Sequence, residues 1–542
     1  MYHLFYPQKT QSLFTNRMAE LQTLEFYKDR LLRGEADKIA FIGTRRIGKS
    51  TILYEFMKRH HADRRLLWAY VNLQHLVIEP LSFAKSYIGL ITKWVVKDRR
   101  DNFPRYEDPE FCMVQLQKVH RRAVNHVYQF IKASQAREIS LKSLLEYALS
   151  FPNLLSECLN RPIIVIIDEF QEITDFRNFK QMPEILGFMR AVTQAHNRIL
   201  YIFAGSYVRL MRNIIDQPDS PFFAQIKPYY VNHFDKENSR LYLAKLCRKI
   251  PLELSTEIEQ SILQATAGHP YYLELLTHAL GETQRREELE LTAENIHRVL
   301  LLQLVNEKSP LYQHLRYIYE DALAHARGSA ILHGALKVLA KDEALTVTEI
   351  AERLSRKPAA IQIVLAELMK VDLVARKEKL YLINDPLLRW WIYFKFYHPE
   401  GAFSLQDRIV QELADDFREK YLQAAAELGR AKEFELYYFV SKMQGKRVGA
   451  VTLPAFKTLI KNYVLPNGDE IDLFARNAES WVFELKWKNK LIGVNEFKKL
   501  KKKIQVDRYV LISKKGFTQE LMTLAKKSSE VILWDAAVMA QE

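Results

Sequence analysis

Residues 43–51 read Gly43-Thr44-Arg45-Arg46-Ile47-Gly48-Lys49-Ser50-Thr51 and match the pattern GxxxxGK[ST] in full. The apolar residues 39–42 (IAFI) come directly before them, and residues 51–60 (TILYEFMKRH) read as a helix. In this context the glycines let backbone N–H groups close around a β-phosphate, and the lysine bridges to the β and γ oxygens. A glycine-containing surface turn is the competing interpretation. The residues expected to contact a bound nucleotide are Gly43, Arg45, Arg46, Gly48, Lys49, Ser50 and Thr51.

A second apolar run ends in two acidic residues. Ile163–Ile167 is followed by Asp168 and Glu169, and in a parallel sheet such a strand end lies near the phosphate loop. We expect Asp168 to hold Mg²⁺ together with the Ser50 hydroxyl, and Glu169 to polarise the attacking water. The pattern therefore predicts ATP hydrolysis, whereas a pair of acids on the surface is the alternative.

A third strand, Ile199–Phe203, leads into Ala204-Gly205-Ser206. Ser206 is placed to sense the γ-phosphate of ATP. The equally supported alternative is an N-cap for the helix that follows, because a serine at a strand end suits either role.

Short β-branched runs alternate with helical stretches in the first part of the chain, as in a parallel sheet flanked by helices. Consecutive helices follow, then three helices with a hairpin, and strands return in the last segment, so the fold class is α/β with several domains. The runs are Lys38–Ile42, Leu66–Val71, Ile163–Ile167 and Ile199–Phe203. The expected domains are 1–235 with a helical insertion at about 82–157, then 236–328, 329–396 and 400–542.

The segment 329–396 has the plan of a winged helix, a helix-turn-helix followed by a wing. Its three helical stretches are followed by two short strands, Leu373–Arg376 and Leu380–Ile383, around Lys377-Glu378-Lys379. The third helix is mostly apolar and weakly basic. DNA contact and protein docking are therefore equally supported.

The last segment carries two acids and a lysine in the spacing of a metal-dependent nuclease. Asp472 lies on one predicted strand, and Glu484 and Lys486 share a face of the next. We expect Asp472 and Glu484 to hold Mg²⁺ or Mn²⁺, and Lys486 to position water and stabilise charge on a phosphodiester. Glu435 supplies a further acid. An ion pair between Glu484 and Lys486 on an inactive scaffold is the alternative.

The chain is basic. Its 542 residues include 79 Lys and Arg against 65 Asp and Glu, and this excess of 14 suits a polyanionic partner. Residues 486–515 alone carry eleven cations against Glu496 and Asp507, a net of +9, which favours DNA, with a solvated helix face as the alternative. The three scattered cysteines and the lack of a signal peptide or long apolar run predict a cytoplasmic protein without membrane association.

The chain resembles the archaeal-type ATPases, a branch of the AAA+ and STAND P-loop proteins. The resemblance rests on the phosphate loop and on Phe14-Thr15-Asn16-Arg17, Asp168-Glu169-Phe170-Gln171, Gly205-Ser206 and Gly268-His269-Pro270-Tyr271-Tyr272. It implies a helical lid over the nucleotide at 236–328, with ATP and Mg²⁺ as cofactors. Residues 400–542 are similar to the restriction-endonuclease-like PD-(D/E)xK domain of unknown function that accompanies these ATPases.

Three functions are compatible with these features. The first is an ATPase that couples its nucleotide state to DNA binding and to metal-dependent DNA cleavage, with assembly into a homo-oligomer allowed. The second is a STAND-type signalling or scaffold protein whose inactive nuclease fold binds nucleic acid or protein. The third, a chaperone-like ATPase acting on protein, predicts ATP turnover that is indifferent to DNA.

Overall fold

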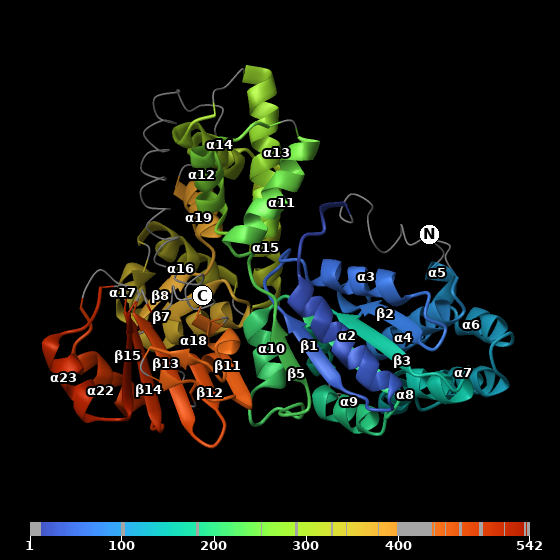
Figure 1. Cartoon of the computed structure of the whole chain (residues 1–542). Helices are drawn as coiled ribbons and strands as arrows, with labels where there is room; N and C mark the ends of the chain where they lie inside the picture. Colours follow the sequence, from blue (N-terminus) through green and yellow to red (C-terminus); the bar gives the residue numbers. More distant parts are fainter. Residues whose placement is uncertain are drawn as a thin grey trace. The chain divides into compact units, whose positions relative to one another are not determined.

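The chain divides into two compact units, Met1–Ser404 and Leu405–Glu542 (Figure 1). The computed structural model describes residues 12–538, apart from 99–102, 180–183, 251, 288–290, 327–328, 343, 378, 398–435, 438, 450, 466–468, 487–490, 514 and 536–537. No helix in this described part is long and apolar enough to cross a membrane.

The first unit contains a five-stranded parallel sheet with the strand order β2-β3-β4-β1-β5. The strands are β1 (Lys38–Ile42), β2 (Leu67–Asn72), β3 (Ile163–Asp168), β4 (Ile199–Gly205) and β5 (Lys227–Tyr230). The four strands predicted from β-branched runs and the parallel sheet are confirmed. The edge strand β5 was not predicted, because its sequence Lys-Pro-Tyr-Tyr has no apolar run and contains a proline, which sheets tolerate at an edge.

Helices cover both faces of this sheet. On one face, α2 (Met18–Leu32) and α3 (Lys49–His60) pack on the side chains of Phe41 and Ile164. On the other face the covering helices include α4 (Pro80–Val95), α8 (Leu141–Cys158) and α9 (Ile185–Gln194). Between α4 and α8 lie α5 (Phe103–Tyr106), α6 (Pro109–Leu116) and α7 (Arg121–Ser134). The segment predicted as a helical insertion is thus helical, and its first and last helices belong to the core of the sheet.

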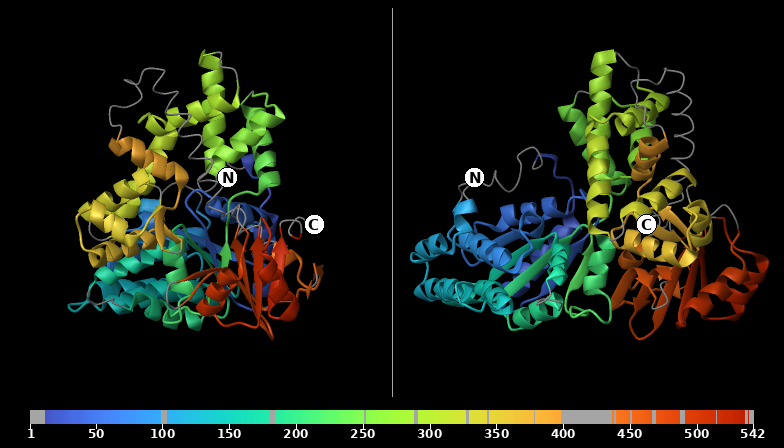
Figure 2. Two further views of the ribbon diagram at one scale, coloured as in Figure 1. Left: turned by 90° about the vertical axis from the view of Figure 1, so that its left-hand side faces the viewer. Right: turned by 180° about the vertical axis from the view of Figure 1, so that it is seen from behind.

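Five helices follow the sheet and pack against one another (Figure 2). They are α11 (Lys236–Lys249), α12 (Thr256–Thr266), α13 (Pro270–Glu287), α14 (Ala293–Val305) and α15 (Pro310–His325). Short polar side chains accept hydrogen bonds from backbone N–H groups at the start of several of them, for example Ser309 at α15.

The remainder of the first unit combines three helices with a small sheet. The helices α16 (Ser329–Asp342), α17 (Val347–Arg353) and α18 (Pro358–Lys370) accompany β6 (Ala344–Leu345), β7 (Val374–Lys377) and β8 (Leu380–Ile383) in the order β6-β8-β7. A capping box of Thr346 and Glu349 starts α17. The aromatic helix α19 (Pro386–Tyr397) packs against α14, α15 and α16, and its Trp391 is completely buried.

The second unit is built on a mixed sheet in the order β11-β12-β13-β14-β15. The strands β11 (Thr458–Val464), β12 (Glu470–Arg476) and β13 (Ser480–Lys486) are antiparallel, and β14 (Arg508–Ser513) and β15 (Val531–Asp535) continue from β13 in parallel. A two-stranded ribbon, β9 (Arg447–Val448) and β10 (Val451–Thr452), precedes them. The helices α22 (Val494–Lys503) and α23 (Gln519–Lys527) pack on one face.

A half-buried carboxylate connects the small sheet to the helix that follows β4. Asp372, between α18 and β7, accepts hydrogen bonds from the backbone N–H of Arg209 (3.2 and 3.1 Å) in the first turn of α10 (Val208–Ile215). Burial raises the pKa of Asp372 to about 6, although the Arg209 N–H group and the guanidinium groups of Arg209 and Arg212 oppose the shift. The contact is therefore sensitive to pH.

Because the pKa of Asp372 is higher in the folded than in the unfolded chain, its contribution to stability is complete below about pH 4 and is lost as the pH rises through about 6. We expect Asp372→Asn to remove about 3 kcal/mol of pH dependence from the free energy of unfolding between pH 4 and 7. Urea unfolding followed by tryptophan fluorescence measures this. The exposed Asp219→Asn is the control, and an unchanged pH profile in Asp372→Asn would contradict the assignment.

Candidate functional site

The phosphate loop connects β1 to α3 at the carboxyl end of the parallel sheet. Two of its residues, Arg46 (φ 58°) and Gly48 (φ 105°), have a left-handed backbone. At Gly43 a Cβ atom would lie 2.4 Å from the carbonyl oxygen of Val231, so that only glycine fits there. Close backbone packing thus fixes the shape of the loop.

Lys49 is the first residue of α3 and is only 5% exposed. Its Nζ donates to the carbonyl oxygens of Gly43 (2.8 Å) and Thr44 (3.1 Å). Burial lowers the pKa of Lys49, and the nearby carboxylates of Glu169 and Asp168 oppose this shift. A buried ammonium group beside a helix N-terminus is a donor set that fits the phosphates of a nucleotide.

Ser50 and Asp168, which were expected to share a magnesium ion, lie in contact. The hydroxyl groups of Ser50 (2.7 Å) and Tyr70 (2.5 Å) both donate to Asp168 Oδ2. Burial and the neighbouring Glu169 raise the pKa of Asp168, whereas the two hydrogen bonds oppose the shift. A hydroxyl and a carboxylate are oxygen donors that fit Mg²⁺. Thr51 follows in the first turn of α3 and is half-buried.

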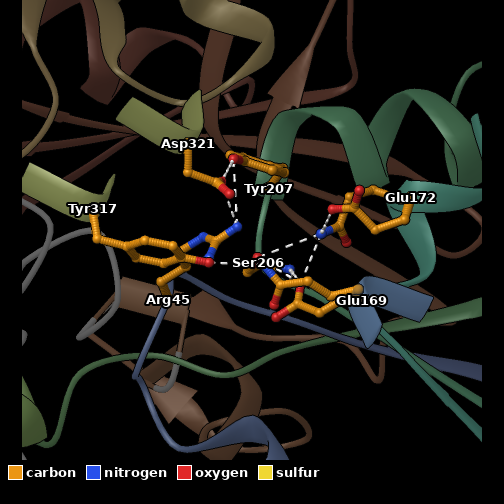
Figure 3. A network of polar contacts seen from close by, with 9 residues as sticks. Arg45, Glu169, Glu172, Ser206, Tyr207, Tyr317 and Asp321 are labelled. Carbon is orange, nitrogen blue, oxygen red and sulfur yellow. Dashed lines mark hydrogen bonds and ion pairs between the residues drawn. The ribbon is translucent and has the colours of Figure 1, made fainter. Parts of the chain in front are cut away.

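Glu169 directly follows β3 and has a left-handed backbone (φ 52°). Its Oε2 accepts a hydrogen bond from the Ser206 hydroxyl (2.6 Å), as Figure 3 shows. It also accepts one from the Gln171 side-chain amide (2.7 Å). Burial raises the pKa of Glu169, but Lys49 and these hydrogen bonds outweigh it, so the pKa is lower than usual. Glu169 is therefore ionised at neutral pH, which suits a group that accepts a proton from water.

The alternative role for Ser206 as a helix N-cap is wrong. The helix α10 starts at Val208, so its N-cap position is Tyr207, and the Ser206 hydroxyl donates to Glu169 instead. This places Ser206 beside the carboxylate that we expect to polarise water.

Sequence analysis missed Tyr70 and gave no role to Gln171. Tyr70 belongs to a predicted strand, and a hydroxyl-bearing side chain near the carboxyl end of a neighbouring strand is the signal that could have identified it. Gln171 lies within the acidic motif, but only its contact with Glu169 shows what it does.

The two arginines of the phosphate loop contact helices that follow the sheet. The guanidinium of Arg46 lies over the ring of Tyr271 in α13, 4.3 Å from its centroid. Arg45 donates to the Asp321 carboxylate (2.6 Å) and the Tyr317 hydroxyl (2.8 Å) in α15 (Figure 3). Both were expected to contact the nucleotide, and both side chains have internal partners in this structure.

In the second unit, Asp472, Glu484 and Lys486 lie near the end of the pairing between β12 and β13. The Asp472 carboxylate accepts from the Leu485 N–H (2.6 Å), and Lys486 Nζ lies 2.8 Å from Glu484 Oε1. Glu484 is buried, and its Oε2 has no hydrogen-bond partner within the part of the chain that the structure describes. The ion pair expected under the alternative interpretation is therefore present, and one buried carboxylate oxygen beside it is unsatisfied.

Glu435, the further acid expected at this site, lies outside the described residues. Within the described part of the chain, no group of three or more His, Cys, Asp and Glu side chains is placed to hold a metal ion. Asp472 and Glu484 remain the two carboxylates predicted to do so.

Comparison with known proteins identifies the first part of the chain. Residues 14–276 match the sequence model of a family described as an ATPase domain predominantly from Archaea. This stretch is therefore similar to an archaeal-type ATPase domain, and α14–α19 and the second unit lie beyond the match. None of the curated proteins compared with the chain is significantly similar to it.

Solved structures are similar to the chain at low sequence identity. The Walker-type ATPase of Pyrococcus abyssi is 16% identical, with a TM-score of 0.47 over 70% of this chain and 96% of that one. The ORC2 protein of Aeropyrum pernix, in ADPNP and ADP complexes, is 15% identical, with a TM-score of 0.42 over 76% and 95%. The RuvB Holliday junction branch migration motor of Thermotoga maritima is 11% identical, with a TM-score of 0.32 over 71% and 95%.

Proposed function

We propose that the chain binds and hydrolyses ATP and that its nucleotide state controls binding to DNA. One observation carries the proposal: the Ser50–Asp168 and Glu169–Ser206 hydrogen bonds lie at the same sheet edge as the buried Lys49. Transfer of a phosphoryl group to water requires a cation, oxygen ligands for a metal ion and an ionised base, and these residues are suited to the three roles.

Each group has a defined role in this mechanism. Backbone N–H groups of the loop and Lys49 hold the phosphates, and Ser50 and Asp168 would hold Mg²⁺. The ion, when bound, neutralises phosphate charge. Glu169 orients a water molecule and accepts its proton, and Ser206 and Gln171 fix the direction of the Glu169 carboxylate.

We assign the remaining segments to DNA binding and to its control. The helices of 236–328 form a lid, and 329–396 form a winged helix, which is supported by three helices followed by the β7–β8 hairpin. In the winged helix, Ile363 of α18 is 68% exposed. An apolar side chain there makes α18 a weak reader of bases, so we assign the main affinity for DNA to phosphate contacts at another surface.

That surface is the lysine face of α22. Lys498, Lys499 and Lys502 are exposed, whereas Phe497 and Leu500 bury the opposite side of the helix. No acidic partner of these three lysines is found among the described residues, and such adjacent lysines neutralise phosphates and give sequence-independent binding that weakens with salt.

Residues 400–542 are assigned to a restriction-endonuclease-like domain. The mixed sheet with helices and the position of Asp472, Glu484 and Lys486 beside one strand end support metal-dependent cleavage of DNA. The unsatisfied Oε2 of buried Glu484 is an oxygen that Mg²⁺ or Mn²⁺ would satisfy.

A second candidate is a STAND-type signalling or scaffold protein with an inactive nuclease fold. The ion pair between Lys486 and Glu484 favours it, because this pair engages a carboxylate that a metal would need. In that case the second unit binds nucleic acid or protein without cleaving it.

The ATPase proposal is tested with Lys49→Ala and Glu169→Gln. Loss of a charged donor should weaken ADP and ATP binding at least about tenfold in Lys49→Ala. Glu169→Gln should keep wild-type binding and hydrolyse ATP about 100-fold more slowly, because it cannot take the proton. Fluorescent nucleotide titration and phosphate release measure the two effects. Wild-type hydrolysis by Glu169→Gln would refute the role given to Glu169.

DNA binding is tested by salt dependence. We expect the paired Lys498→Ala and Lys499→Ala substitutions to reduce the slope of log Kd against log salt by about 2, since each lysine neutralises about one phosphate. Fluorescence anisotropy with duplex DNA measures the slope. Lys526→Ala with Lys527→Ala, on α23, removes the same charge as a control. Equal effects of the two pairs would mean that α22 is no DNA surface.

Nuclease activity is tested with Asp472→Asn and Lys486→Ala on plasmid DNA in Mg²⁺ or Mn²⁺. Both substitutions should reduce cleavage at least about 100-fold, because they remove a metal ligand and a charge stabiliser. Glu479→Gln changes an exposed acid at the other end of β13 and should cleave like the wild type. Cleavage that survives in both site variants excludes this site, and no cleavage by the wild type favours the STAND-type function.

A further inference from the structure

One face of α15 meets the phosphate loop from outside the segment matched by the ATPase family. His314, Tyr317 and Asp321 lie three and four residues apart, so they share this face. Tyr317 accepts hydrogen bonds from Arg45 of the loop and from the Gln74 side chain (2.8 Å each). The helix therefore contacts two segments that begin at the carboxyl ends of strands, where a nucleotide would bind.

Asp321 is the centre of these contacts (Figure 3). Its carboxylate forms an ion pair with Arg45 (2.6 Å), and the two side chains are only 12% and 13% exposed. The Tyr207 hydroxyl, next to Ser206, donates to the same carboxylate oxygen. The guanidinium also lies over the rings of Tyr207 and Tyr317, at 5.3 and 5.1 Å. A nearly buried anion thus holds the Arg45 side chain.

A guanidinium group binds carboxylates and phosphates through the same fork of N–H donors. Arg45 lies between Gly43 and Gly48, in the segment that closes around nucleotide phosphates. We propose that Asp321 is an internal anion that occupies Arg45 in place of a nucleotide phosphate, so that nucleotide binding releases α15 from the loop. This inference rests on the proposed ATP binding, and it names Asp321 as the residue that competes with the nucleotide for Arg45.

Two features of the site would lower the free energy of this exchange. The Tyr207 hydroxyl also donates to Asp321, so the carboxylate does not depend on Arg45 alone. His314 is 4% exposed, and neither ring nitrogen has a hydrogen-bond partner among the described residues, which makes its position unfavourable. Burial, together with Arg45 and Arg46, lowers the pKa of His314 to about 3, so the ring is neutral and adds no attraction for Asp321. The packing of α15 against the loop therefore includes an unfavourable contribution from His314 as well as the favourable ion pair of Asp321.

The test compares Asp321→Asn with Glu320→Gln in the full-length chain. Asn keeps the shape of Asp321 and removes its charge, so Arg45 is no longer held by an anion and can bind a phosphate. The affinity for methylanthraniloyl-ADP should therefore increase about tenfold, which is within the usual range of coupling between two sites. Glu320 is the next residue on α15, is 54% exposed and pairs with Arg316, so its variant should bind like the wild type. Deuterium exchange of residues 310–325 should increase when ADP is added to the wild type and be high in Asp321→Asn without ADP.

Unchanged or weaker ADP binding by Asp321→Asn overturns the inference. If this variant does not fold, as judged by its thermal unfolding, Tyr317→Phe replaces it, because it removes one acceptor of Arg45 at a half-exposed position. Tighter ADP binding by Tyr317→Phe supports the inference, and wild-type binding overturns it. Failure of the wild type itself to bind ADP would instead refute the proposed ATPase and the inference with it.

Discussion

The hydrogen bond from the Ser50 hydroxyl to the Asp168 carboxylate joins residues 118 positions apart in the sequence. It forms because β1 and β3 run parallel, so the loop after one and the acid ending the other meet at the same edge. The hydroxyl of Tyr70, in the neighbouring strand β2, donates to the same carboxylate. Without this convergence, the loop and the acids would be separate polar segments with no shared chemistry.

Two acidic residues connect this edge to the later parts of the first unit. Asp321 of α15 holds the loop arginine, and Asp372 accepts from the first turn of α10, two residues beyond the Tyr207 that also contacts Asp321. Both acids therefore contact segments at or beside the predicted nucleotide site.

Much of this arrangement could be predicted from the sequence. Four strands of the parallel sheet, the phosphate loop and the pairing of Ser50 with Asp168 follow from local patterns, because apolar runs and glycine spacing are read within a few residues. Asp321 and Asp372 could not be found in this way. Each is a single acid in a helical or turn segment, and its partner lies far away in the chain. The strand β5 was missed because it forms by pairing with β1 and its sequence has no apolar pattern.

The left-handed backbone of Glu169 has a consequence for the stability of the whole domain. A residue with a side chain costs on the order of 1 kcal/mol more than glycine in this conformation. The fold therefore accommodates a conformational penalty at a position where the proposed chemistry needs a carboxylate. Selection for thermal stability alone would favour glycine there, which would remove the carboxylate that we propose orients the water, so stability and the proposed chemistry make opposite demands on residue 169.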